Sequence, residues 1–215
     1  GAISCPVYAI GGWSDAYSNA IPRLLAELKV PRKGLIGPWA HLYPHDGVPG
    51  PAIGFLQEAL RWWDQWLKGN DTGIMAEPIL RVWMQESVRP RPFHKQRPGR
   101  WVAETQWPSP RITFSRYWLN PDRLSSLLTE ETQIDLRSPQ TTGLGAGEWC
   151  GFGAPGEAPP DQRADDGCSL TFDSEAFQER QEILGAPVAT LEVAADQRVA
   201  FIAVRLNDVA PDGTS

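Results

Sequence analysis

Short apolar runs alternate with helical apolar repeats in the first 70 residues. Residues 5–10 are apolar and partly β-branched and end at a Gly-Gly pair, while residues 34–36 form a second apolar run that ends at Gly-Pro. Such runs are typical of strands buried on both faces of a parallel sheet. Between the two runs, apolar side chains recur at i, i+3, i+4 and i+7, which predicts one buried helical face: Ile21, Leu24, Leu25 and Leu28.

A second helix is predicted from about Pro51 to Lys68, with Gly69 as the signal that ends it. We expect its apolar residues to be buried: Ala52, Leu56, Ala59, Leu60, Trp63, Trp66 and Leu67. The order strand, helix, strand, helix predicts a βαβα unit with parallel strands.

The pattern changes near residues 70–77, where we place a domain boundary that divides the chain into residues 1–72 and 73–215. Beyond it, short alternating segments are separated by turns rich in Pro, Gly and Asp: 79–83, 112–118, 169–172, 188–193 and 199–206. This spacing predicts an all-β domain, an antiparallel sandwich or jelly roll. Residues 141–160 are rich in Gly and Pro and indicate a long loop, in which Trp149 and Phe152 can pack.

Composition narrows the classes of function. The chain has 20 Lys plus Arg and 26 Asp plus Glu, a formal charge of −6, without a block of like charges that would track nucleic acid. We therefore expect no nucleic-acid partner, and the absence of a long apolar run predicts no membrane span. Cys5, Cys150 and Cys168 form no Cys-x-x-Cys pair, which argues against a zinc cluster or a disulfide framework and favours a reducing compartment such as the cytoplasm.

Two side chains that could do chemistry follow the two predicted parallel strands. Asp15 comes just after the first strand and His41 just after the second. If the strands are neighbours, about 5 Å apart, their exit loops bring the carboxylate within reach of the imidazole. The carboxylate would orient the imidazole as a general base, and the order Asp then His suits the second half of a Ser…Asp…His triad. The spacing alone also allows Asp15 to be a turn or cap residue and His41 an ordinary loop histidine.

Several motifs resemble one known family. They are Gly-Trp-x-Asp within residues 5–15, Gly-Pro-Trp-small-His at 37–41 and the Trp-rich residues 60–69, followed by matching segments at 100–101, 107–108, 117–119, 161–167 and 205–213. Together they resemble the cocaine-esterase-like CocE/NonD hydrolases of the X-Pro dipeptidyl-peptidase (S15) group. The resemblance implies the end of an α/β-hydrolase domain followed by a non-catalytic jelly roll of galactose-binding-like topology.

The family pattern also implies roles for individual residues. Asp15 would orient His41, and His41 would be the general base. Ala40 stands where the family commonly has Ser or Thr, a change that removes no triad member. No Gly-x-Ser-x-x-Gly nucleophile turn occurs in the sequence, and Ser14 is followed by the presumed triad Asp rather than by such a turn. We therefore expect the chain to be a segment of a longer protein whose nucleophile and oxyanion hole lie upstream.

Other candidate sites are weaker. Pro44 separates His41 from His45, which argues against a helical zinc pair, and the glycines at 143, 145 and 147 lack the strand and helix of a dinucleotide loop. Asp64 is expected to make a structural ion pair or hydrogen bond.

The sequence thus predicts a serine hydrolase in the longer protein and no turnover by this chain alone. We expect a small-molecule ester, amide or peptide substrate, no cofactor and no metal, and we leave open a homo-oligomer. The competing hypothesis is a non-catalytic β module that binds a carbohydrate or a protein partner, since the ten tryptophans could stack on sugars.

Overall fold

The computed structural model describes residues 2–215. Its first strand, β1 (Val7–Gly12), runs parallel to β2 (Arg32–Gly37), with the register running from Val7 opposite Arg32 to Gly12 opposite Gly37. Helix α1 (Ala20–Glu27) connects them and buries Ile21 and Leu25. The predicted strand, helix, strand order is therefore confirmed.

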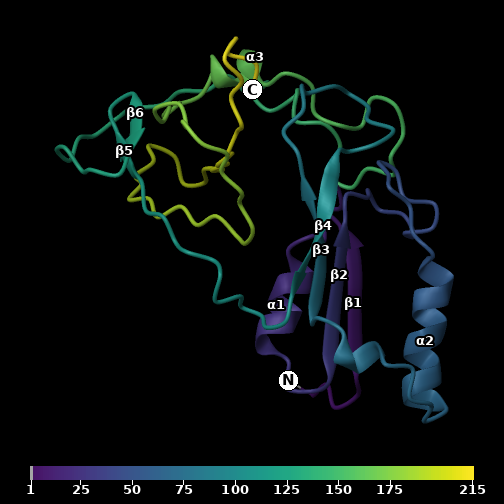
Figure 1. Ribbon diagram of the computed structural model, residues 1–215. Coiled ribbons are helices and arrows are strands. Elements are labelled where there is room, and N and C mark those ends of the chain that lie inside the picture. Colours follow the sequence, from purple (N-terminus) through teal and green to yellow (C-terminus); the bar gives the residue numbers. More distant parts are fainter. Residues whose placement is uncertain (1) are drawn as a thin grey trace.

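The sheet extends beyond this unit. Strand β3 (Leu80–Gln85) pairs in parallel with β2, and β4 (Gly99–Glu104) pairs antiparallel with β3, giving the order β1-β2-β3-β4 (Figure 1). The strand expected at 79–83 is confirmed, but it is hydrogen-bonded to the sheet of the first unit. One sheet thus runs across the division near residue 72, and that division stays a prediction.

The two faces of this sheet carry different cores. On the α1 side, Ala9, Ile36 and Leu80 pack with Ile21 and Leu25. Helix α2 (Phe55–Leu67) contacts the opposite face, where the Tyr8 ring lies 5.2 Å from that of Trp62 (Figure 1). Because neighbouring residues of a strand point to opposite faces, the alternation in β1 serves both helices.

The buried side of α2 differs from the one that the sequence predicted. The helix begins at Phe55, and Glu58 and Trp62 are its buried residues. Four apolar side chains that we expected in the core are more than half exposed: Leu56, Leu60, Trp63 and Leu67. The reason is an ion-pair network between α2 and the sheet, which turns the face of α2 that carries Glu58 toward the sheet.

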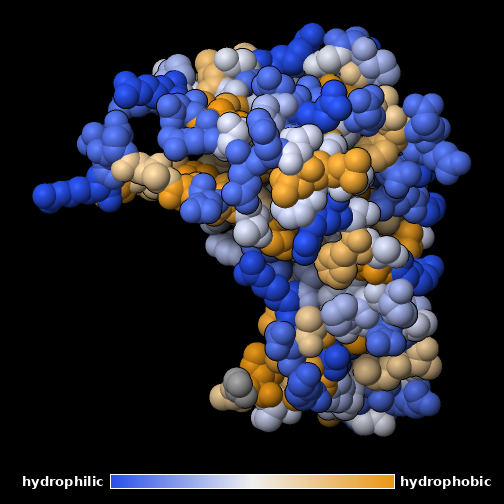
Figure 2. All heavy atoms as spheres, turned by 90° about the vertical axis from the view of Figure 1, so that its left-hand side faces the viewer, coloured by the Kyte–Doolittle hydropathy of each residue, from blue (hydrophilic) through white to orange (hydrophobic). Residues whose placement is uncertain are grey.

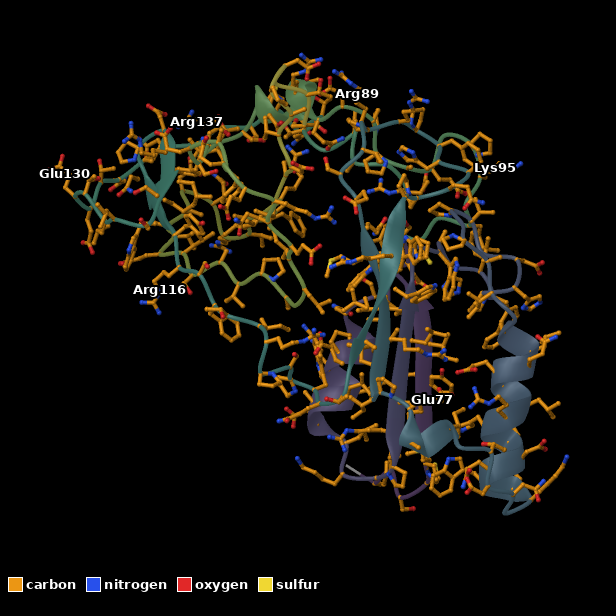
Figure 3. The ribbon with its side chains drawn as sticks, in the orientation of Figure 1. Glu77, Arg89, Lys95, Arg116, Glu130 and Arg137 are labelled. Atoms are coloured by element: carbon orange, nitrogen blue, oxygen red, sulfur yellow. The ribbon has the colours of Figure 1, made fainter. Side chains whose placement is uncertain are left out.

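Acids and bases alternate in that network. The Glu58 carboxylate accepts hydrogen bonds from the Tyr8 hydroxyl and Arg81, and Arg61 bridges Glu58 to Glu77. Figure 3 shows Glu77 near the start of β3. Burial, followed by the hydrogen bond to Glu58, raises the pKa of Tyr8, so the phenol stays protonated. These contacts fix α2 to β1 and β3.

The fully buried Lys33 belongs to the same network. Its ammonium donates to the Ile74 carbonyl at 2.7 Å and to Glu77 at 3.1 Å. Burial lowers the pKa of Lys33, while Glu77 opposes that shift. The short 3₁₀ helix η1 (Ile74–Ala76) is thereby held at the entrance to β3.

Residues 105–215 contain little regular structure. Strands β5 (Trp118–Asn120) and β6 (Arg123–Ser125) form a hairpin, and α3 (Arg163–Asp166) is a single turn. Figure 1 shows the chain leaving the end of β4 near α1 and rising to this hairpin at the upper left. An ion pair of 2.7 Å between Arg89, labelled in Figure 3, and Asp212 ties the end of the chain to the loop after β3.

The strands predicted at 169–172, 188–193 and 199–206 are wrong, and of 112–118 only Trp118 is in a strand. Most of their apolar side chains are exposed, with Val188 85% and Phe201 99% exposed, although Ile112 packs against the core of the sheet. Figure 2 shows apolar residues interspersed with polar ones on the face that it presents. A strand is stable only when its backbone groups pair with another, and in the described chain these segments have no such partner. The jelly roll stays a prediction.

No helix within residues 2–215 combines the length and the apolar character needed to cross a membrane.

Candidate active site

The loops that carry Asp15 and His41 leave the sheet side by side. Gly12 and Gly37 are paired at the carboxyl ends of β1 and β2. Beyond them the backbones stay hydrogen-bonded, since the Trp13 amide donates to the Gly37 carbonyl at 2.9 Å and the Ser14 amide to the Trp39 carbonyl at 3.1 Å. The pairing of the strands therefore continues into both loops and sets their spacing.

Two glycines permit this close approach. A Cβ atom at Gly12 would lie 1.9 Å from the Trp39 carbonyl oxygen, and one at Gly37 would lie 2.4 Å from the Trp39 ring. Trp39 is fully buried, and its indole N–H donates to the Pro51 carbonyl at 2.8 Å. The close packing of Gly12 and Gly37 against Trp39 thus fixes the two exit loops.

Asp15 and His41 meet at this edge of the sheet. The Asp15 Oδ2 atom lies 3.0 Å from Nδ1 of His41, and the Asp15 Oδ1 atom accepts a hydrogen bond of 2.9 Å from the Tyr17 amide. Asp15 is therefore both a turn residue, through the Tyr17 amide, and a hydrogen-bond partner of His41. The Asp15 side chain is 12% exposed and that of His41 43%, so the carboxylate is shielded while the ring stays accessible.

A distant loop completes the surroundings of the histidine. The His41 amide donates to the Gly151 carbonyl at 2.9 Å, and the Phe152 ring meets the imidazole edge-to-face with centroids 5.5 Å apart. The centroid of the Tyr17 ring lies 5.8 Å from that of the imidazole and 6.1 Å from that of Trp149. The loop over 141–160 was expected, with Trp149 and Phe152 available for packing, but its contact with His41 was not.

Cys150, in the same loop, is a third polar group here. One ligand atom each from Asp15, His41 and Cys150 lie within 4.8 Å of one another, and no other trio of His, Cys, Asp or Glu in residues 2–215 is arranged to hold a metal ion. No local sequence pattern predicts that Cys150 lies close to His41.

The remaining candidates have structural partners. The Ser14 hydroxyl donates to the Pro38 carbonyl at 3.1 Å, away from any role as nucleophile, and His45 stacks on Phe55 with centroids 5.8 Å apart. Asp64 forms the expected ion pair, at 2.6 Å from Lys68.

The glycines near residue 145 bind a carboxylate of the chain itself. The amides of Gly143 and Gly145 donate to Asp165 at 3.0 and 3.2 Å. The neighbouring Asp166 accepts from Arg205 at 2.7 Å. The motifs at 161–167 and 205–213 are therefore joined by a structural network.

Two parts of the chain match models of known families. Residues 72–215 match the model of the X-Pro dipeptidyl-peptidase C-terminal non-catalytic domain, and residues 1–43 match that of X-Pro dipeptidyl-peptidase (S15 family). The chain belongs to the X-Pro dipeptidyl-peptidase family. Asp15 and His41 both lie in the part that matches the peptidase model.

Two curated proteins are similar to almost the whole of this chain. A protein of Mycobacterium bovis and one of Mycobacterium tuberculosis, each named "Putative serine esterase", are 30% identical to this chain over 228 residues. The match covers 99% of this chain and 34% of each relative. The chain thus spans about a third of the length of the relatives that it matches.

Proposed function

We propose that the protein containing this chain is a serine hydrolase of CocE/NonD type that acts on acyl esters, amides or peptides. The observation that carries the proposal is the 3.0 Å contact between Asp15 and Nδ1 of His41 at the carboxyl ends of two parallel strands. Membership of the S15 family supports a serine hydrolase, and the names of the two relatives favour an ester substrate.

In this proposal, the serine and the oxyanion-hole donors lie outside these 215 residues. The Nδ1–H group of His41 donates a hydrogen bond to the Asp15 carboxylate, which leaves the lone pair of Nε2 free. His41 takes the proton of the serine hydroxyl as its oxygen attacks the acyl carbonyl, and then gives that proton to the departing alcohol or amine. A water molecule, activated by His41 in the same way, then hydrolyses the acyl-enzyme and releases the carboxylic acid.

Residues 73–215 would form the non-catalytic domain, with the jelly-roll topology that the family resemblance implies. Its contribution to the site is the loop of Trp149 and Phe152, which covers one side of His41. A sugar-binding module stays the competing hypothesis. Three of the ten tryptophans are buried and cannot stack on a sugar, namely Trp39, Trp62 and Trp107, whereas four are exposed: Trp63, Trp101, Trp118 and Trp149.

Replacement of His41 tests the proposal. In a longer form of the protein that hydrolyses p-nitrophenyl acyl esters, His41→Ala should lower kcat by about 10³-fold or more, because the serine loses its base. His45→Ala is the matched control, since His45 stacks on Phe55 and should be dispensable. Hydrolysis at the wild-type rate by His41→Ala would remove the assignment. Parallel assays with an X-Pro p-nitroanilide distinguish an esterase from a peptidase.

A further inference from the structure

The candidate active site contains a thiol that the proposed hydrolytic mechanism does not use. Cys150 is partly buried, and its Sγ atom belongs to the trio whose ligand atoms lie within 4.8 Å of one another. Its position is fixed on both sides, because the Gly151 carbonyl accepts the His41 amide and the Glu148 amide donates to the Glu157 carbonyl at 2.8 Å. Three separate segments, the two strand exits and this loop, thus supply one donor each.

The donor set suits one class of ion. Thiolate sulfur, imidazole nitrogen and carboxylate oxygen are the ligands of zinc, and three protein ligands with an open fourth position are typical of accessible zinc sites. Magnesium and calcium prefer oxygen ligands alone. Ligand atoms around a tetrahedral zinc lie about 3.3–3.8 Å apart, given bond lengths of about 2.0–2.3 Å. The largest separation in the trio, at most 4.8 Å, has to contract by about 1.0–1.5 Å to reach this spacing, which the partly exposed side chains of Cys150 and His41 allow.

We propose that Asp15, His41 and Cys150 form a binding site for Zn²⁺ or a similar soft divalent cation. The thiol loses its proton to solvent as the metal binds. A neutral imidazole has one free lone pair. Whichever ring nitrogen of His41 binds the ion, the other nitrogen carries the proton, so metal binding and base catalysis at His41 exclude each other. The binding site stands on the geometry of the three donors, and only this inhibitory effect rests on the proposed function.

Cobalt serves as the spectroscopic probe. Titration of the 215-residue chain with Co²⁺ should produce a thiolate-to-cobalt charge-transfer band that saturates at one ion per chain, and Zn²⁺ should abolish it by competition. Cys150→Ser should remove the band and weaken Zn²⁺ binding by at least about tenfold in calorimetry, because a hydroxyl is a much poorer zinc ligand. Cys168→Ser is the matched control and should show the same cobalt band and Zn²⁺ affinity as the wild type. Adding Mg²⁺ to the wild-type chain should leave the cobalt band unchanged.

A second measurement needs no variant. Zn²⁺ should slow alkylation of Cys150 by iodoacetamide in the wild-type chain, as followed by peptide mass spectrometry, and leave alkylation of the exposed Cys5 unchanged. Absence of the cobalt band together with unprotected Cys150 would overturn the metal site. A band that survives in Cys150→Ser would overturn it too.

These results are distinguishable from a failure of the proposed function. If the longer protein hydrolyses esters through His41 and the chain binds no metal, only the metal site is wrong. If the chain binds Zn²⁺ but His41→Ala retains full hydrolysis, only the proposed function is wrong.

Discussion

Similar apolar patterns form paired strands in the four-stranded sheet but mostly irregular chain in residues 105–215. In the sheet, the apolar strands pair with one another, and their side chains are covered by helices on both faces. Residues 105–215 also contain alternating apolar segments, but in the described chain their strand pairing is limited to the β5–β6 hairpin and one bridge between Arg123 and Asp173. An apolar pattern thus produces a strand only where a partner edge is within reach.

The site lies where these two regions meet. The sheet positions Asp15 and His41, while the irregular region supplies Gly151 and Phe152 against the histidine. The region with regular structure therefore fixes the positions of Asp15 and His41, and the loop shapes the surroundings of His41. Three substitutions, in order of decreasing effect, can break or sharpen this contrast.

The largest effect on stability is expected in the core of the sheet. Leu25 is 1% exposed, so Leu25→Ala should lower the free energy of unfolding by about 2–5 kcal/mol, as cavity-forming core substitutions do. Phe201→Ala is the matched control at a residue that is 99% exposed, with an expected change within about 0.5 kcal/mol. Urea unfolding measures both. Equal losses in the two variants would show that Phe201 is packed and that the contrast is false.

A smaller effect is expected where the sheet meets the site. Gly12→Ala places a methyl group against the Trp39 carbonyl, and the required shift should cost about 1–3 kcal/mol. The same shift separates the Asp15 and His41 loops, so hydrolysis by the longer protein should fall as well. Gly167→Ala is the control, since its added Cβ meets nothing closer than 3.5 Å. Unchanged stability and activity in Gly12→Ala would contradict the role given to this contact.

The third effect concerns the link between the sheet and the irregular region. Glu104, the last residue of β4, accepts hydrogen bonds from the Ser109 hydroxyl at 2.6 Å and from Arg111 at 2.5 Å. Burial alone would raise its pKa, but Arg111 and Ser109 outweigh burial and hold the pKa below the ordinary value of 4.5. A lowered pKa gives stability that is present above the ordinary value and is lost as the pH falls through the folded-state pKa.

Glu104→Gln should therefore cost about 1–2 kcal/mol at pH 7, and its difference from the wild type should shrink as the pH falls below about 4.5. Urea unfolding from pH 7 to pH 3 measures this dependence. If the difference in unfolding free energy stays constant over that range, the charge of the Glu104 carboxylate does not contribute to stability.

The sequence predicted those features that depend on neighbouring residues and on the order of strands. The α1 repeat and the two strand exits suffice to place Asp15 beside His41, because parallel neighbours end at one edge of the sheet. The buried face of α2 was mispredicted because Glu58 is drawn inward by Arg81, a partner distant in the sequence. The approach of Cys150 to the histidine was missed for the same reason, since no local pattern encodes contacts made by an irregular loop.

The central claim is that Asp15 and His41 act as one catalytic unit, and a double-mutant cycle tests it most directly. In a hydrolytically active longer form of the protein, Asp15→Asn and His41→Ala are measured singly and together as kcat/KM for a p-nitrophenyl ester. Each should lower kcat/KM by about 10³-fold or more, and the double variant should be little worse than His41→Ala alone, because Asp15 acts only through the imidazole. Losses that multiply in the double variant, or a wild-type rate in Asp15→Asn, would contradict the account.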